Sequence, residues 1–186
     1  MATPFFTVGH SNRSLEAFAA LLRQSDIALV ADIRRLPGSR AHPQFDAEPL
    51  AHALSGLQIG YEHFAALGGR RGKGRGAESP NGLWTNTSFR NYADYALTEP
   101  FQAGLACLLD TGRRRRCAMM CAEAVWWRCH RRIVADYLLA RGESVLHILG
   151  EGRVEPARLT PGADIQPDGT VLYPRKASVT ATLPKP

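Results

Sequence analysis

Short apolar runs alternate with segments of helical periodicity over the first 150 residues. Ile27-Ala-Leu-Val-Ala-Asp-Ile33 is apolar on successive positions up to Asp32, as expected of a strand buried on both faces of a parallel sheet. Over residues 15–24, by contrast, Leu15, Phe18 and Leu22 recur at helical spacing. The alternation predicts an α/β fold with a single open, mainly parallel sheet of about five strands and helices on both faces, which is a Rossmann-like arrangement.

Caps and turn residues give approximate bounds to these elements. Ser14, Asp46, Ser88 and Thr98 are suited to capping helices, and Gly142 is a typical helix stop. The strands are expected at residues 5–10, 27–33, 59–64, 117–121 and 144–149. The helices are expected at residues 15–24, 46–57, 88–96, 98–109 and 125–141.

The C-terminal part of the chain differs from the rest in composition. Residues 1–150 are expected to form the α/β domain, and residues 151–186 a Pro-rich extension packed on the same domain. The Pro-Asp-Gly sequence within residues 165–173 predicts a small turn or hairpin. No apolar run approaches the roughly 20 residues that span a bilayer, and the N-terminus has no secretory signal. We therefore expect a cytoplasmic protein with no membrane partner, whose four cysteines are reduced.

Positive charge is concentrated in two stretches. Residues 68–76 carry four basic side chains and no acid, and residues 113–132 carry seven basic side chains against Glu123 alone. The net charge of the whole chain is only +6, so the remainder is net acidic. Focused basicity favours an anionic ligand such as a nucleotide or nucleic acid, although a solvated basic face gives the same pattern.

Polar side chains follow four of the expected strands. His10, Asp32 with Arg34, His63 with a glycine-rich loop, and the segment Cys121–Glu123 each come directly after an apolar run. Ligands in open α/β folds bind beyond the carboxyl ends of the strands. The sequence therefore predicts one composite site at this edge of the sheet.

Two familiar phosphate-binding motifs are excluded. A phosphatase loop of the Cys-x5-Arg type would need arginine where Trp127 stands, because Arg128 comes one residue too late. The loop at residues 68–76 lacks the spacing and the Lys-Ser/Thr pair of a Walker A motif. Only a generic cationic phosphate-binding loop remains possible there.

The cysteines leave several interpretations open. Cys121, at a strand end before a helix, is either a reactive thiol or a buried strand residue. A zinc site from Cys121, Cys129 and His130 is not expected, because Cys-x-x-Cys is absent and neighbours on one helix point about 100° apart. Cys107 and Cys117 are expected to be small core residues.

The charged and aromatic residues of the same stretch also have two interpretations each. Glu123 is a site carboxylate or a first-turn helix charge, and His130 is a base or a structural histidine. Arg131 either pairs with Glu123 or binds an anion with it. Of the adjacent Trp126 and Trp127, at most one is expected to face the core, which leaves the other to stack on a base. Asp32 with Arg34 is likewise a site pair or a loop brace.

The chain resembles the bacterial domain of unknown function 488 family over most of residues 6–175. The motifs are Thr7-Val-Gly-His-Ser-Asn12, Asp32-Ile-Arg34 with Pro37 and Arg40, Leu67-Gly-Gly69, Phe89-Arg90-x-Tyr92-Ala-Asp-Tyr95, Cys121-Ala-Glu123 and Cys129-His-Arg131. The resemblance implies that these residues belong to one composite site, and it implies no particular reaction or cofactor.

The leading hypothesis is an enzyme that acts on a phosphorylated, nucleotide or nucleic-acid substrate. The alternatives are a non-catalytic nucleic-acid-binding module and a thiol- or metal-dependent sensor. The candidate catalytic residues are Glu123, His130, Asp32, Cys121 and His10. The candidate substrate-binding residues are Arg34, Arg40, Gly68, Gly69, Arg90, Tyr92, Tyr95 and Arg131.

Overall fold

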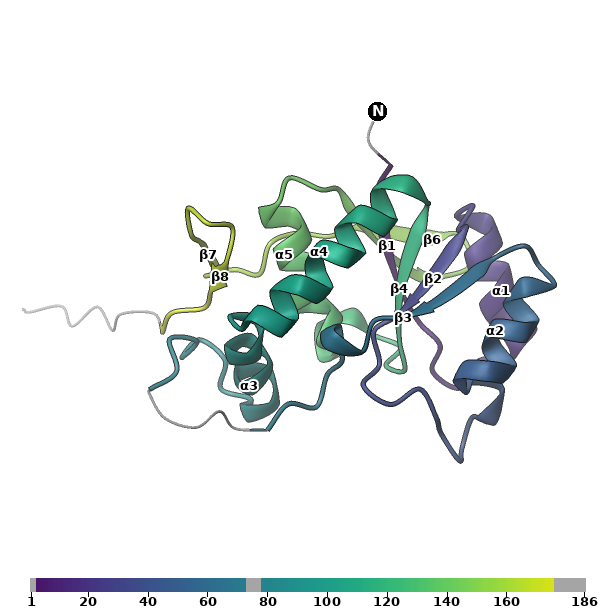
Figure 1. Ribbon diagram of the computed structural model, residues 1–186, viewed down its shortest axis with the longest axis horizontal. Coiled ribbons are helices and arrows are strands. Elements are labelled where there is room, and N and C mark those ends of the chain that lie inside the picture. The colour runs from purple at the N-terminus through teal and green to yellow at the C-terminus, as the bar shows by residue number, and fades with distance from the viewer. Residues whose placement is uncertain (1–2, 73–77, 176–186) are drawn as a thin grey trace, which may run out of the picture.

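A six-stranded sheet runs through the centre of the molecule (Figure 1) in the computed structural model, which describes residues 3–72 and 78–175. The strand order is β3-β2-β4-β1-β5-β6; the first five strands are parallel, and β6 pairs antiparallel with β5 at one edge. The strands are β1 (Phe5–Gly9), β2 (Leu29–Asp32), β3 (Gly60–His63), β4 (Cys117–Cys121), β5 (Val145–Gly150) and β6 (Arg153–Pro156). The predicted mainly parallel α/β fold is confirmed.

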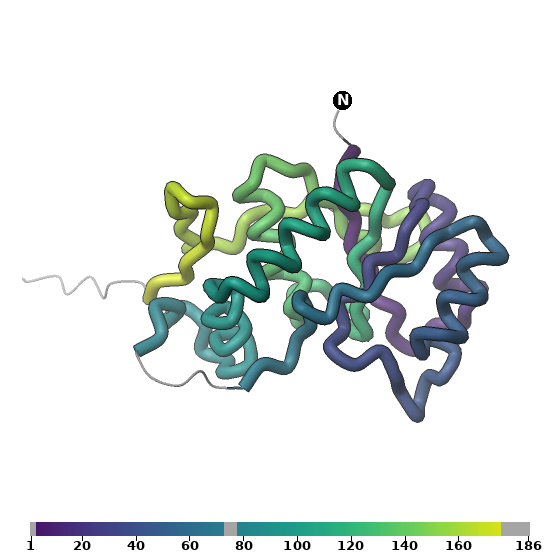
Figure 2. The backbone as a smooth tube through the Cα atoms, viewed as in Figure 1, coloured from purple at the N-terminus to yellow at the C-terminus, as the bar shows by residue number. Residues whose placement is uncertain are grey.

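Helices cover both faces of this sheet, as the ribbon and the backbone tube show (Figures 1 and 2). Helices α1 and α2 pack on one face, where Phe18 and Leu50 join Val8 and Val30 of the sheet in one buried cluster. Helices α3, α4 and α5 cover the other face. The helices are α1 (Leu15–Gln24), α2 (Ala47–Ser55), α3 (Thr87–Ala96), α4 (Glu99–Arg114) and α5 (Arg131–Ala140), with short 3-10 turns η1 (Pro43–Phe45), η2 (Ala65–Leu67) and η3 (Trp126–Arg128).

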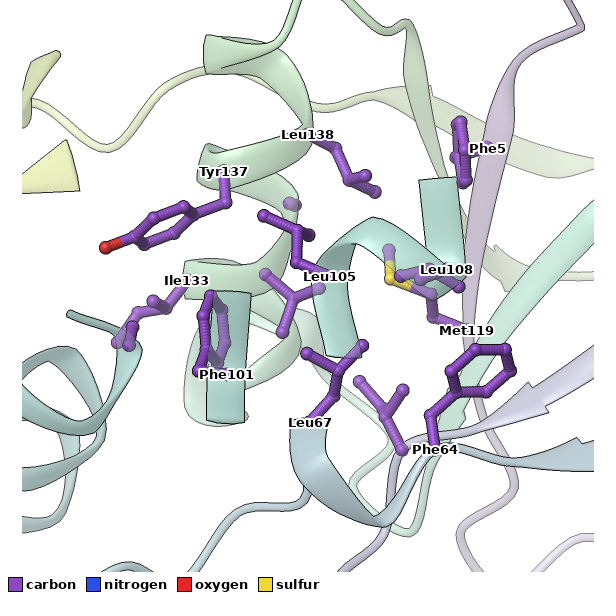
Figure 3. Packing of buried hydrophobic residues seen from close by; sticks show 14 of the residues in the cluster. Phe5, Phe64, Leu67, Phe101, Leu105, Leu108, Met119, Ile133, Tyr137 and Leu138 are labelled. Carbon is purple, nitrogen blue, oxygen red and sulfur yellow. The ribbon is translucent and has the colours of Figure 1, made fainter. Parts of the chain in front are cut away.

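The larger core lies between the sheet and the helices α4 and α5. Figure 3 shows Phe101 and Leu105 of α4 among Ile133 and Tyr137 of α5, with Phe5 and Met119 of the sheet beside them. These side chains are fully or almost fully buried. Burial of each side chain of this size stabilises the fold by about 1.5–3 kcal/mol. The core therefore holds the strands, and with them their carboxyl ends, in fixed positions.

Two neighbouring strands, β1 and β4, send their connections in opposite directions. The chain leaves β1 through α1 to reach β2, beyond β4, whereas it leaves β4 through α5 to reach β5, beyond β1. The two connecting helices lie on opposite faces of the sheet. Such a point of divergence leaves a crevice at the carboxyl ends of the two strands, and ligands bind there in open α/β sheets.

The helix predicted over residues 125–141 begins later than expected. It starts at Arg131, because Trp126–Arg128 form the 3-10 turn η3 and Cys129 has an extended backbone with ψ of 148°. Residues 122–130 are therefore a connecting segment between β4 and α5 rather than the start of a helix. The extended backbone at Cys129 allows side chains of this segment to meet that would point apart on one helix.

Two smaller expectations were also wrong. Helix α3 is capped by Asn86, whose side chain accepts from the backbone N–H of Ser88 and Phe89, and not by Ser88. Cys107 is exposed on α4, because it lies off the face that buries Leu105 and Leu108, whereas Cys117 is buried as expected.

The described part of the C-terminal region packs against the α/β domain. Strands β7 (Asp164–Ile165) and β8 (Val171–Leu172) form the predicted hairpin, and Tyr173 is buried with its hydroxyl donating to Asp136 Oδ2 at 2.8 Å. The division at residue 150 stays a prediction. Within residues 3–72 and 78–175, no helix is both long and apolar enough to cross a membrane.

Candidate functional site

An open pocket of about 480 Å³ lies at the carboxyl ends of β1 and β4, where their connections diverge. One wall is the loop that follows β1, and the other is the segment that follows β4. Its lining residues are His10, Ser11, Asn12, His42, Ala122, Glu123, Ala124, Val125 and Arg128. The pocket thus combines imidazoles, a carboxylate and a guanidinium in one place.

Glu123 and Arg128 are the two charged side chains of the lining, and both are exposed. Among the described residues, neither makes a salt bridge. The backbone around Glu123 is nevertheless fixed: its carbonyl accepts a hydrogen bond of 2.6 Å from Arg131 Nη2 and lies directly against Gly9. The exposed carboxylate of Glu123 and guanidinium of Arg128 therefore stand on a well-anchored segment.

His10 is buried beneath the pocket and is held on both sides of its ring. Its Nδ1–H donates to the carbonyl of Ser11 at 2.9 Å, and the ring stacks on Phe45 with centroids 4.2 Å apart. Its Nε2 faces Nη1 of Arg34 at 3.4 Å. Burial, assisted by the charge of Arg34, lowers the pKa of His10 to about 4, against the opposing hydrogen bond to Ser11. The imidazole is therefore neutral near pH 7.

Asp32 and Arg34 form a buried ion pair behind His10, with Nη2 of Arg34 2.6 Å from Oδ2 of Asp32. The hydroxyl of Tyr61 donates to the same carboxylate at 2.7 Å, and Arg34 Nη2 also donates to the carbonyl of Phe45 at 2.7 Å. The paired Asp32 raises the pKa of Arg34 above its usual value although burial opposes this. The pair joins β2 to the loop over residues 35–46. It does not line the pocket.

Three potential metal ligands converge beside this network. The Sγ atoms of Cys121 and Cys129 lie 3.9 and 3.6 Å from Nδ1 of His130. All three ligand atoms lie within 4.8 Å of one another. The expectation that Cys129 and His130 diverge on one helix was wrong, because Cys129 precedes α5 in an extended conformation and His130 caps it.

The two thiols differ in acidity. The hydrogen bond with Cys129, together with burial, raises the pKa of Cys121 to about 12. Burial alone would raise the pKa of Cys129 as well, but the hydrogen bond with Cys121 and the charge of Arg131 lower it to about 7. Cys129 is thus the member of the pair that ionises first.

Arg131 is buried, with 1% of its surface exposed, and has no carboxylate partner among the described residues. Its Nη2 donates to the carbonyls of Glu123 and, at 3.4 Å, of Ala124, and its Nε lacks a partner. The predicted pairing with Glu123 therefore involves the backbone of Glu123 and not its carboxylate. Arg131 therefore stabilises the wall of the pocket through the backbone of Glu123.

Gly68 and Gly69 make close packing possible beside the thiols. A Cβ on Gly68 would lie 2.6 Å from Cα of Arg35, and a Cβ on Gly69 would lie 2.7 Å from Nδ1 of His130. The nearby tyrosine hydroxyls are used internally: Tyr92 donates to the carbonyl of Leu67 at 2.6 Å, and Tyr95 donates to that of Ala66 at 2.7 Å. The two tyrosine hydroxyls hold the turn η2 against α3.

Two predicted arginines lie elsewhere. Arg90 lines a second cavity of about 500 Å³, together with Trp84 and Arg175, that shares no lining residue with the first. Arg40 is exposed on the loop between β2 and α2. Lys73 and Arg75, two of the basic side chains of the expected phosphate-binding loop, lie outside the described residues.

Several lining residues, among them Asn12, His42 and Arg128, were not among the candidate site residues. Asn12 and Arg128 stand within or beside motifs that were identified, so proximity in sequence could have indicated them. His42 had no such signal. It reaches the pocket only because the loop over residues 35–46 is folded back by Arg34 and Phe45.

Comparison with known proteins identifies the family. No curated protein and no solved structure matches the chain. Residues 14–138 match the family described as "Domain of unknown function DUF488". This match spans most of the α/β domain, including Asp32, Glu123 and His130. The chain belongs to the domain of unknown function 488 family.

Proposed function

We propose that the protein is an enzyme that acts on a phosphorylated, nucleotide or nucleic-acid substrate in the pocket between the segments that follow β1 and β4. One observation carries the proposal: this pocket lies where the connections of β1 and β4 diverge, and its lining contains Glu123 and Arg128, two exposed charged groups that make no salt bridge within residues 3–72 and 78–175. Ligand sites of open α/β sheets occur at this position. The concentration of basic residues at 113–132 supports an anionic substrate.

The two charged groups have distinct roles in this proposal. Arg128 binds the anionic group, because a guanidinium offers paired N–H donors to phosphate or carboxylate oxygens. Glu123 transfers a proton to or from the reacting group, which requires a carboxylate within hydrogen-bond reach. His10 is neutral, with both ring nitrogens engaged by Ser11 and Arg34. It therefore positions the β1 loop.

The predicted catalytic and binding residues beneath the pocket act indirectly in this scheme. Asp32 and Arg34 hold the floor of the pocket, and Arg131 holds the carbonyl of Glu123. They are proposed as positioning residues, whose loss would change the shape of the pocket rather than remove a reacting group.

A substrate panel with matched variants tests the proposal. Full-length protein is incubated with phosphate esters, nucleotides and short RNA and DNA, and products are detected by mass spectrometry. Glu123→Gln should reduce turnover by about 10²–10⁴-fold at unchanged thermal stability. Glu48→Gln, at an exposed site on α2, is the control and should leave turnover unchanged. Equal turnover by both variants would contradict the role of Glu123.

The role of Arg128 is tested by measuring substrate affinity separately from turnover. Removal of hydrogen bonds to a charged group costs about 1.5–3 kcal/mol, so Arg128→Ala should weaken substrate binding by roughly 10- to 150-fold. Arg153→Ala, on the exposed edge strand β6, is the matched control. A substrate affinity that is the same for both variants would place the anion elsewhere.

A second candidate is a non-catalytic nucleic-acid-binding module, and one observation favours it. Trp127 is 48% exposed and lies beside Arg128 on η3, whereas Trp126 stacks on His147 with ring centroids 4.3 Å apart. An exposed indole next to a guanidinium is suited to stacking on a base. This function predicts binding that weakens steeply with salt and with Trp127→Ala, and that is insensitive to Glu123→Gln.

A further inference from the structure

Cys121, Cys129 and His130 have the geometry of a tetrahedral metal site with three protein ligands. Zinc bonds of about 2.3 Å to sulfur and 2.0–2.1 Å to nitrogen place a sulfur and a nitrogen about 3.6 Å apart in a tetrahedron. The observed separations from Nδ1 of His130 are 3.9 Å to Cys121 Sγ and 3.6 Å to Cys129 Sγ. The two sulfur atoms also lie within 4.8 Å of each other. Only small side-chain movements separate this arrangement from an ideal one.

The surroundings of His130 prepare its Nδ1 for coordination. Its Nε2 lies 2.8 Å from the carbonyl oxygen of Ile33, which accepts a hydrogen bond and therefore requires the proton on Nε2. The lone pair is then on Nδ1, the nitrogen that faces both thiols. In protein metal sites, the second ring nitrogen of a histidine ligand commonly donates to a backbone carbonyl in this way.

Two further contacts favour a metal at this place. The backbone N–H of Arg131 donates to Sγ of Cys129 at 3.4 Å, which stabilises sulfur in its thiolate form. Gly69 also lies close to His130, because a Cβ at position 69 would be 2.7 Å from Nδ1 of the ring. The glycine keeps that approach to the ring nitrogen free of a side chain.

We propose that Cys121, Cys129 and His130 bind one zinc-class divalent cation, with the fourth position left to water or another small ligand. Two thiolates and one imidazole select a borderline-soft cation such as Zn²⁺ or Co²⁺ over Mg²⁺ or Ca²⁺. Sites with three protein ligands keep an open coordination position. The proposal does not depend on the function assigned to the pocket.

The cation would fasten the segment that forms one wall of the pocket. Cys121 ends β4, and Cys129 with His130 begins the approach to α5, so coordination closes the segment over residues 122–128. His130 in turn is joined to β2 through Ile33. A bound cation should therefore protect residues 122–128 from hydrogen exchange and proteolysis.

Cobalt titration of the reduced, full-length protein tests the site. One equivalent of Co²⁺ per chain should bind, with a thiolate-to-cobalt charge-transfer band in the near ultraviolet and intense visible bands of a tetrahedral ion, and Zn²⁺ should abolish both. Cys121→Ser and Cys129→Ser should each weaken binding by more than the 10- to 100-fold that loss of an outer-shell contact costs. Cys107→Ser and Cys117→Ala are thiol controls and should bind as the wild type does.

A second measurement applies even if a ligand variant fails to fold. Alkylation of the wild-type protein, mapped by mass spectrometry, should show that Zn²⁺ protects Cys121 and Cys129 but not the exposed Cys107. Folded protein that shows no charge-transfer band would overturn the proposal. So would a Cys121–Cys129 disulfide that reforms after reduction in the presence of excess Zn²⁺, or cobalt spectra that persist in both serine variants.

Discussion

Gly9, the last residue of β1, lies directly against the backbone carbonyl of Glu123, and a Cβ at position 9 would overlap that oxygen. The same oxygen accepts the hydrogen bond from Arg131 Nη2. Two elements distant in sequence thus hold one peptide group at the junction of β1 and β4. This contact places Glu123 in the wall of the pocket.

Gly9→Ala should destabilise the protein by about 1–3 kcal/mol, because the carbonyl it meets is backbone and cannot rotate away. It should also reduce ligand binding, since the wall of the pocket must move. Chemical denaturation gives the free energy of unfolding. Gly150→Ala is the matched control at the end of the neighbouring strand β5, where an added Cβ meets nothing within 4 Å. Equal stability of the two variants would show that the close contact is absent in solution.

Arg34→Leu should destabilise the protein by about 3–5 kcal/mol, because it leaves the fully buried carboxylate of Asp32 without its cation. The comparison is Arg153→Ala, which removes one member of the exposed pair with Glu155 and should cost at most about 1 kcal/mol. The free energies of unfolding of both variants are measured near pH 7. If Arg34→Leu lowers the free energy of unfolding by no more than Arg153→Ala does, Asp32 must be solvated or protonated.

The stability of the protein should fall below pH 6.5, in part through His147. Burial, with a smaller effect of the charge of Arg131, lowers the pKa of His147 from 6.5 to about 4. Between these values the unfolded imidazole binds a proton and the folded one does not, so acid favours unfolding. This contribution is fully present above pH 6.5 and is lost as the pH falls toward 4.

The contribution of His147 is measured by urea unfolding at pH 7.5 and pH 5. The drop in the free energy of unfolding between these pH values should be smaller in His147→Gln than in the wild type, by on the order of 2 kcal/mol. His52→Gln, at an exposed position on α2, should retain the drop of the wild type. A drop in His147→Gln as large as that of the wild type would show that the buried ring is protonated in the folded state.

Local patterns predicted most of the sheet but not its exposed edge. The buried runs at residues 27–33 and 117–121 are apolar because helices cover both faces, and they became β2 and β4. Strand β6, Arg153–Pro156, is exposed at every residue and therefore carries no hydrophobic signal. Its pairing with β5 depends on backbone hydrogen bonds, which residue type does not encode.

The place of the candidate pocket was predictable, whereas the contacts that occupy the neighbouring polar side chains were not. The parallel strand order brings the segments after β1 and β4 together, as the polar strand ends indicated. The sequence left Asp32 with Arg34 open as a site pair or a loop brace, and in the structure the donors of Arg34 are taken by Asp32 and by the carbonyl of Phe45. Likewise, the convergence of Cys129 and His130 depends on the contact of His130 with Ile33, 97 residues away.

Binding of an anion in the pocket is the most direct test of the central claim. Crystals of the full-length protein are soaked in tungstate, a phosphate mimic whose anomalous scattering locates it without ambiguity. Tungstate should bind between the loop His10–Asn12 and Arg128, and it should be absent from that position in Arg128→Ala crystals. Tungstate found only at other positions, such as the cavity beside Arg90 and Arg175, would contradict the assignment of this pocket as the substrate site.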